Sequence, residues 1–210
     1  MPRVPSYASN KNGTQTMSLT KKIAVAAALT VMSISGVNAA GEHEEPMRSY
    51  GAETVTQWIS NADLIAAIKA QNAKTAALSE AEIVTMDKQW RAQTGAASKP
   101  MIDDVLGRPV SKWLSDMKEK SGGVVTEVFV MDAKGLNVAQ SDVTSDYWQG
   151  DEAKWKQTFL VGPDAVHVSD VEEDESTQTL QSQLSMPVVD PASGQVIGAV
   201  TIGVNLDALL

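Results

Sequence analysis

The spacing of apolar residues changes once along this chain, at Ser121-Gly122-Gly123. Before this point apolar residues recur every three or four positions, which is typical of amphipathic helices. After it β-branched residues become frequent and the repeat falls to two, which is typical of strands. Helices followed by strands and short turns predict an α+β domain, in which helices pack on an antiparallel sheet.

Helices are predicted in four places before the change. One long helix is expected over 52–72, because no glycine or proline interrupts its apolar stripe. A second helix is expected to begin after Ser79, which precedes two acids in the manner of an N-cap, and to run to about residue 93. Short helical segments are expected at 101–106 and from Pro109 up to the glycines.

Five strands are predicted after the change. Their ranges are 124–131, 136–141, 165–169, 179–187 and 196–204. The first two flank Asp132-Ala133-Lys134-Gly135, which is typical of a hairpin turn. The last strand is apolar on both faces, so we expect it at the centre of the sheet. A helical segment is expected at 151–159, and an acidic connection at 171–177.

The first forty residues have no pattern for a core. Residues 1–16 are polar and are interpreted as an unstructured extension, which makes Met17 a candidate for the true start. Residues 17–40 carry Lys21-Lys22, a short apolar run and the small-residue triplet Val37-Asn38-Ala39, as secretory signal peptides do. The apolar run has about twelve residues, whereas a membrane-spanning helix needs roughly twenty.

Cleavage near residue 40 would leave a flexible lead-in over 41–51 and a single domain over 52–210. The remaining chain would be exported, most simply to a bacterial periplasm, without membrane insertion. It contains no cysteine, so its stability has to come from its core. Residues 1–40 hold four of the 17 basic residues and none of the 26 acidic ones, so the domain is strongly acidic. This charge argues against nucleic acid as a partner.

The closing segments 183–190 and 194–204 read Gln-Leu-Ser-Met-Pro-Val-Val-Asp and Gly-Gln-Val-Ile-Gly-Ala-Val-Thr-Ile-Gly-Val. With the preceding hairpin and tryptophan-bearing linker, they resemble the extracellular sensor domains of the Cache (PDC, PAS-like) family over about 50–210. The resemblance implies a PAS-like five-stranded sheet, a long N-terminal helix and a small ligand between sheet and linker. It also implies a free-standing domain that signals through a membrane receptor or kinase partner, or through a homodimer.

The linker 141–155 supplies most of the predicted ligand-binding residues. They are Asp146, Tyr147, Trp148, Trp155 and, after the linker, Asp174. Amino-acid-binding members of the family carry an arginine two residues before a tryptophan. Trp148 matches that tryptophan, but Asp146 stands in the place of the arginine that would grip a carboxylate. We therefore expect a small polar or cationic ligand, and Asp174 matches a family aspartate that often contacts a ligand amine.

A different class of function remains open. Trp148 and Trp155 could simply pack the linker onto the sheet and fill the groove. The domain would then be a structural or interaction module without a small ligand, and helix 52–72 would be its working surface as a dimer or partner face.

Three further residues have open roles. Glu127 is expected on the solvent or pocket face of its strand, Lys154 could grip an anion, and His167 is expected to be structural.

The sequence carries no motif of an enzyme. It has no cysteine nucleophile, its two histidines are far apart, and phosphate-loop, dinucleotide and Gly-x-Ser-x-Gly motifs are absent. We predict no catalytic residue, no cofactor and no metal site. The acidic run 172–175 lacks the spacing of a calcium loop, and whether it binds a divalent cation stays open.

Overall fold

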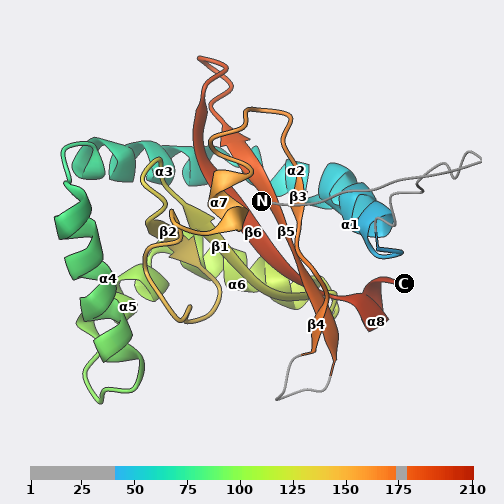
Figure 1. Cartoon of the computed structure of the whole chain (residues 1–210), viewed down its shortest axis with the longest axis horizontal. Coiled ribbons are helices and arrows are strands. Elements are labelled where there is room, and N and C mark those ends of the chain that lie inside the picture. Colours follow the sequence, from blue (N-terminus) through green and yellow to red (C-terminus); the bar gives the residue numbers. More distant parts are fainter. Residues whose placement is uncertain (1–40, 174–178) are drawn as a thin grey trace, which may run out of the picture. The chain divides into compact units, whose positions relative to one another are not determined.

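An antiparallel sheet forms the centre of the domain (Figure 1). The computed structural model describes residues 41–173 and 179–210, so the predicted extension, the signal peptide and Asp174 lie outside the described residues. The strands are β1 (Val125–Met131), β2 (Asn137–Gln140), β3 (His167–Val168), β4 (Glu172–Glu173), β5 (Leu180–Val189) and β6 (Val196–Asn205). Their order is β2-β1-β6-β5-β3, with β4 also paired to β5.

β6 lies between β1 and β5, as its apolar faces predicted. Its central Val200 pairs with Val130 of β1 on one side and with Met186 of β5 on the other. The short strands β3 and β4 both pair with β5, so the sheet has five positions although it contains six strands. The α+β, PAS-like fold class is confirmed.

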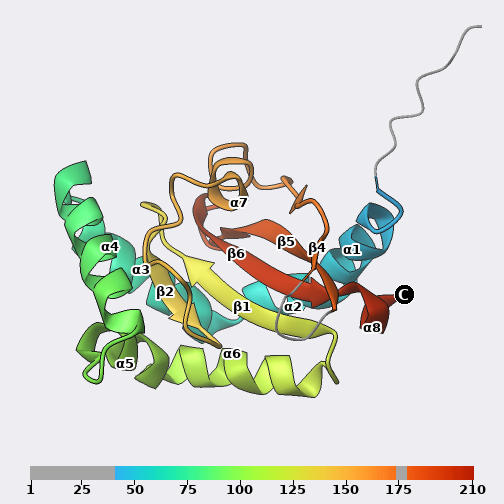
Figure 2. The same cartoon turned by 60° about the horizontal axis from the view of Figure 1, so that its bottom comes forward.

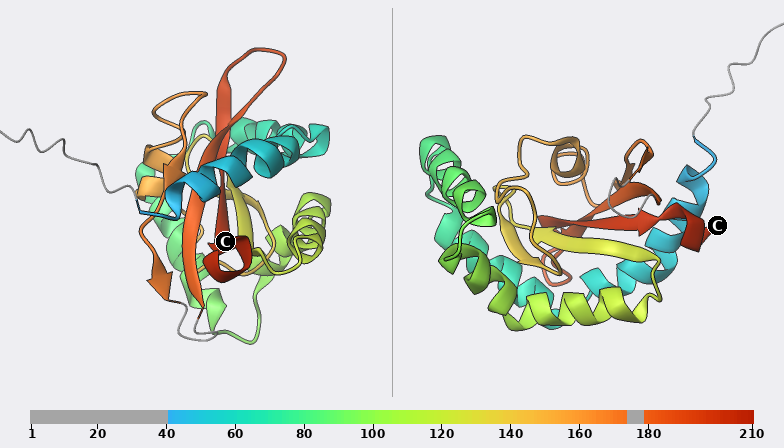
Figure 3. Two further views of the ribbon diagram at one scale, coloured as in Figure 1. Left: turned by 90° about the vertical axis from the view of Figure 1, so that its right-hand side faces the viewer. Right: turned by 90° about the horizontal axis from the view of Figure 1, so that it is seen from below.

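The helices lie on both sides of this sheet. They are α1 (Glu44–Tyr50), the π-helical turn η1 (Gly51–Val55), α2 (Thr56–Ile59), α3 (Ala62–Thr75), α4 (Glu80–Thr94), α5 (Pro100–Gly107), α6 (Pro109–Lys120), α7 (Ala153–Lys156) and α8 (Leu206–Leu209). Figure 2 shows α6 below the sheet and α7 above it, and the right-hand view in Figure 3 repeats this arrangement. The larger core lies on the α3 and α6 side, where Ile68 and Leu114 pack with Ile202 of the sheet.

The prediction of one helix over 52–72 is wrong, because the chain breaks at Ser60-Asn61. The Asn61 side chain accepts hydrogen bonds from the backbone N–H groups of Asp63 (2.9 Å) and Leu64 (3.1 Å), and so caps α3. The preceding helical run starts at Glu44, so most of the expected lead-in 41–51 is helical. None of the described helices is long and apolar enough to cross a membrane.

The local signals for the other helices and turns were correct. Ser79 and Glu82 form a capping box at the start of α4. Gly122 and Gly123 follow α6 with φ of 66° and 97°, and Gly135 turns the β1–β2 hairpin with φ of 80°. These conformations are costly for residues with a Cβ atom, which explains why glycine marks each turn.

Candidate functional site

The linker is tied to the β1–β2 hairpin by backbone hydrogen bonds. The N–H of Asn137 donates to the carbonyl of Tyr147 (3.0 Å), and the N–H of Gln149 donates to that of Gly135 (2.7 Å). Gly135 and Gly150 meet so closely that a Cβ atom on either would overlap the backbone of the opposite segment. Residues 147–150 of the linker therefore pack directly against the hairpin.

The side chain of Asp146, within the linker, is buried and faces α4. Its carboxylate accepts hydrogen bonds from Nη2 of Arg91 (2.9 Å) and from the side-chain amide of Gln149. Nε of the same arginine donates to Asp87 (2.7 Å), whose other oxygen accepts from the backbone N–H of Tyr147 (2.9 Å). The negative charge of Asp146 is thus already matched by a cation of the domain itself.

The aromatic residues of the linker pack in two different directions. Tyr147 stacks on Trp90 of α4 with ring centroids 5.4 Å apart, and burial raises its pKa to about 12. Trp155 stacks on Phe159 at 4.8 Å, and its indole N–H donates to the carbonyl of Asp132 (3.1 Å). The indole N–H of Trp148 donates to the carbonyl of Lys134 (2.9 Å).

The structure therefore does not gather the predicted site residues around one cavity. Tyr147 borders a cleft on the helix side of the sheet, whereas Trp155 belongs to α7 on the opposite side. Asp174 lies outside the described residues. The ligand-binding roles of Asp146, Tyr147, Trp148, Trp155 and Asp174 stay predictions.

A cleft of about 330 Å³ lies between α7 and the strands β3 and β5, where a ligand between sheet and linker was expected. We call it the linker-side cleft. Its lining is largely polar and includes Glu152, Lys154, His167, Gln181 and Gln183. Three segments far apart in the sequence supply these side chains, so no single sequence motif could have marked the cleft.

Glu127 of β1 lies behind this cleft and contacts Gln183, which lines it. Its carboxylate accepts a hydrogen bond from Nε2 of Gln183 (2.9 Å), and burial raises the pKa of the Glu127 carboxyl. The hydroxyls of Ser185 and Thr201, which pair across β5 and β6, lie 2.9 Å apart on the same face of the sheet. A polar row therefore runs across a face that α7 and the linker cover.

Two groups on the opposite wall can carry a positive charge. Lys154 forms an ion pair with Glu152 (2.9 Å) and lies 5.4 Å from the centre of the Phe129 ring. Burial, reinforced by Arg48, lowers the pKa of His167, so its imidazole is neutral at neutral pH. Within residues 41–173 and 179–210, no group of three or more histidine, aspartate or glutamate side chains could hold a metal ion.

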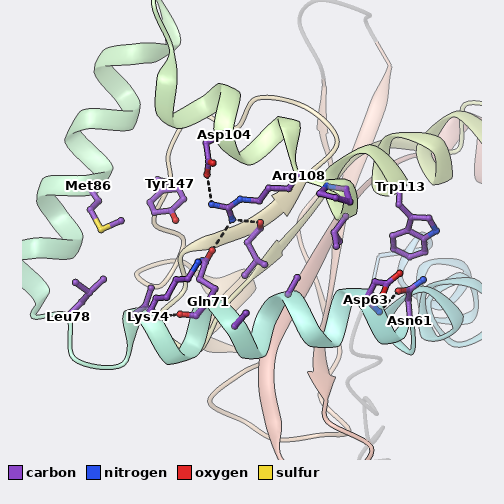
Figure 4. A pocket seen from close by; sticks show the side chains of 16 residues that line it. Asn61, Asp63, Gln71, Lys74, Leu78, Met86, Asp104, Arg108, Trp113 and Tyr147 are labelled. Atoms are coloured by element: carbon purple, nitrogen blue, oxygen red, sulfur yellow. Dashed lines mark hydrogen bonds and ion pairs between the residues drawn. The ribbon is translucent and has the colours of Figure 1, made fainter.

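A second cleft, of about 900 Å³, lies on the other side of the sheet between α3 and α6 (Figure 4). We call it the helix-side cleft. Arg108 reaches into it and donates through Nη1 to Oε1 of Gln71 (3.0 Å) and to the carbonyl of Val138 (2.7 Å). This cleft could not be predicted from the sequence, because Arg108 stands in the short connection between α5 and α6 and resembles any surface cation.

No protein-family model matches the chain, and no match was found among curated protein sequences. The comparison with solved structures gave several similar folds. The structural neighbours are sensor domains. One is the sensor domain of the Vibrio cholerae histidine kinase DctB, with 14% identity, 80% of this chain and 56% of the neighbour covered, and a TM-score of 0.35.

Two other neighbours are ligand-binding domains of chemoreceptors. The Pseudomonas aeruginosa amino acid chemoreceptor PctC, in complex with GABA, has 16% identity and a TM-score of 0.38, with 62% of this chain and 54% of the neighbour covered. The Campylobacter jejuni chemoreceptor Tlp3, in complex with 4-methylisoleucine, has 10% identity and a TM-score of 0.37, with coverages of 81% and 63%. The chain thus spans less than two thirds of the length of each of these three neighbours.

Proposed function

We propose that this chain is a sensor domain that binds a small polar ligand in the linker-side cleft. Occupancy would then pass to a membrane receptor, a kinase partner or a second copy of the chain. The observation that carries the proposal is the polar row on the covered face of the sheet. Glu127, Gln183 and the Ser185–Thr201 pair lie where a domain without a ligand would place apolar side chains.

The energetic reason is the cost of covering polar groups. A buried polar group loses its water and needs a partner in the protein or in a ligand. The linker-side cleft leaves about 330 Å³ next to these groups, which falls in the range of roughly 300–1,000 Å³ typical of small-molecule sites. These groups are paired with each other in the protein, so a ligand that covers them has to keep or replace those hydrogen bonds, which favours a ligand with hydrogen-bonding groups of its own.

The charges around the cleft favour an amine or another cationic group. Lys154 and Glu152 neutralise each other as an ion pair, which leaves the carboxylates of Glu172 at the cleft and of Glu127 behind it. A cationic ligand next to Glu127 would also relieve the cost of that buried carboxylate. The sequence suggested the same preference from Asp146, but that carboxylate is paired with Arg91 and does not line this cleft.

The predicted linker residues belong to this proposal as supports of the cleft. Trp155 is part of α7, which closes the cleft, and Asp146 with Trp148 holds the segment that leads into α7. Asp174 follows β4 and belongs to the proposal through the family pattern. Export to the periplasm by a cleavable signal peptide over 17–40 is also part of the proposal.

A thermal-shift screen tests the proposal. The purified chain would be screened against amines, amino acids, carboxylates and divalent cations. A ligand at 100 times its dissociation constant should stabilise the chain by about 2.7 kcal/mol. The Glu127→Gln and Gln183→Ala variants should lose this shift, whereas Glu119→Gln, an exposed acid on α6, should keep it. The proposal fails if no amine or other polar compound raises the melting temperature of the chain. It also fails if a ligand raises the melting temperature of both variants as much as that of the wild type.

An interaction module without a small ligand is the second candidate. It is favoured by the hydrogen bonds of the Trp148 and Trp155 indoles to hairpin carbonyls, which show both rings packed against the domain. The two candidates differ in solution. A module of this kind would show no response to the ligand panel, and sedimentation would show a dimer or a complex with a partner protein.

A further inference from the structure

The helix-side cleft contains an arginine that the fold fixes in place. Asp132, which is fully buried at the start of the hairpin turn, accepts hydrogen bonds from Nε2 of Gln71 (3.2 Å) and from the hydroxyl of Thr75 (2.9 Å). These bonds orient Gln71 so that its Oε1 accepts a hydrogen bond from Nη1 of Arg108 (3.0 Å). The carbonyl of Val138 accepts a second hydrogen bond from the same nitrogen (2.7 Å). A guanidinium anchored in this way loses little conformational entropy when it binds a ligand.

The Nη2 side of this guanidinium is the side available to a ligand in the cleft. Nη2 of Arg108 donates to Asp104 (2.8 Å), but the Asp104 side chain is 69% exposed, so solvent screens the pair. The Tyr147 hydroxyl lies beside the guanidinium. A ligand carboxylate could therefore take the place of Asp104 at Nη2 and form a less screened ion pair.

A second cation shares this end of the cleft. Lys74 of α3 makes no hydrogen bond or ion pair with any described residue, and Figure 4 shows its side chain pointing into the cleft toward Arg108. Asp63, which also lines the cleft, lies at its far end beside Trp113 in the same view. Among the described residues that line this end of the cleft, the exposed Asp104 is the one acid beside Lys74 and Arg108.

Between these two ends the cleft wall is largely apolar. Ala67 and Ala70 of α3 leave space because their side chains are small, and Val110 and Trp113 of α6 line the opposite side. The ring of Trp113 is only partly buried. An inorganic anion would leave this surface exposed to water, whereas an organic acid would cover it.

We propose that the helix-side cleft binds a small organic carboxylate with an apolar or aromatic body. Its carboxylate contacts Lys74 and Arg108, and its body lies along Ala70 and Trp113. The site is separate from the linker-side cleft, because the sheet lies between α6 and α7 (Figure 2). It differs in chemistry as well, since it favours an anion and the linker-side cleft favours a cation.

Isothermal titration of the full chain tests this site. The probes are phenylacetate, indoleacetate and hexanoate, each with its uncharged amide as a control. We expect saturable binding of at least one carboxylate, and binding of its amide weaker by about tenfold or more. Lys74→Gln should weaken the binding of the carboxylate by about tenfold. Ala70→Trp, which fills the cleft, should abolish this binding.

Two control variants locate the binding. Lys112→Gln removes the same charge from an exposed position on α6 that does not line the cleft, and should leave the affinity unchanged. Glu127→Gln alters only the linker-side cleft and should also have no effect. The inference is overturned if no carboxylate binds, if the amide binds equally well, or if Lys74→Gln has no effect. A loss of carboxylate binding in the Glu127→Gln variant would place the ligand on the other side of the sheet. That result would also overturn the inference.

Discussion

Nη2 of Arg91 donates to the carboxylate of Asp146 at 2.9 Å, across 55 positions of sequence. This bond joins the last turns of α4 to the start of the linker that covers the sheet. Asp87, one helical turn before Arg91, completes the contact by accepting from Nε of Arg91 and from the backbone of Tyr147. The position of the linker therefore depends on α4, and residues of α4 can affect a ligand that they do not touch.

Removal of the Asp146 carboxylate tests this connection. Asp146→Ala leaves Arg91 with one partner and leaves the buried amide of Gln149 without one of its acceptors. We expect the free energy of unfolding to fall by about 1–3 kcal/mol, measured by urea titration. Asp116→Ala, at an exposed acid of α6, should change it by less than about 0.5 kcal/mol. Equal effects of the two substitutions would contradict the structural role of Asp146.

The close approach of Gly150 to the hairpin gives a second prediction. A Cβ atom at this position would overlap the Trp148 indole nitrogen and meet the carbonyl oxygen of Lys134 at 2.7 Å, two atoms that are hydrogen-bonded to each other. Gly150→Ala should destabilise the chain by about 1–3 kcal/mol through overpacking. Gly107→Ala is the matched control, because no atom lies within 4 Å of its added methyl group. A thermal melt in which Gly150→Ala unfolds no earlier than this control would rule out the clash.

The burial of the Glu127 carboxyl leads to a prediction of how stability depends on pH. Burial raises the pKa of its carboxyl above the ordinary value of about 4.5. The stability supplied by the neutral form is complete below about pH 4.5, and is lost as the pH rises through the raised pKa. Glu127→Gln keeps an acceptor for Gln183 and removes the charge.

The Glu127→Gln variant should therefore match the wild type in acid and become more stable than it toward neutral pH. Urea titrations at a series of pH values give the difference directly. A difference that stays constant with pH, or that grows toward acid, would show that burial does not raise this pKa. Glu119→Gln, at an exposed position, should show no such trend.

The break between α2 and α3 predicts the effect of losing the cap. Asn61→Ala removes the acceptor of two backbone N–H groups and should cost about 1 kcal/mol in the free energy of unfolding. Asn61→Asp retains the acceptor and should keep most of the stability. If both substitutions cost the same in denaturant titrations, the side chain of Asn61 does not act as a cap.

The sheet could be predicted from the sequence because its signals are local. The repeat of two over 179–187, the continuous apolar run over 196–204 and the turn at Gly135 each depend on neighbouring residues. The break at Asn61 was missed for the opposite reason. Its apolar stripe continues in phase from Val55 to Ile68, since both helices bury that face in the same core, and the cap is visible only as one polar residue.

The candidate sites depend on contacts between distant segments. Asp146 was recognised as an unusual residue, but its partner Arg91 could not be found from a linker motif. Glu127 and His167 were noted singly, and the antiparallel pairing of the strands brings them to the face of the sheet on which α7, with Lys154, packs. Pairings of this kind are set by the fold as a whole, so no local pattern records them.

The contact between linker and hairpin also affects how copies of the chain can meet. Exposed strand edges invite other chains to add strands, which is a common route to aggregation. Here the linker takes up the outer edge of β2 through the N–H of Asn137, and the opposite edge consists of β3 and β4, each with two residues. Among the described strands the sheet is thus protected from extension at both sides. A second copy of the chain therefore meets no long free edge among the described strands, and association by added strands is disfavoured.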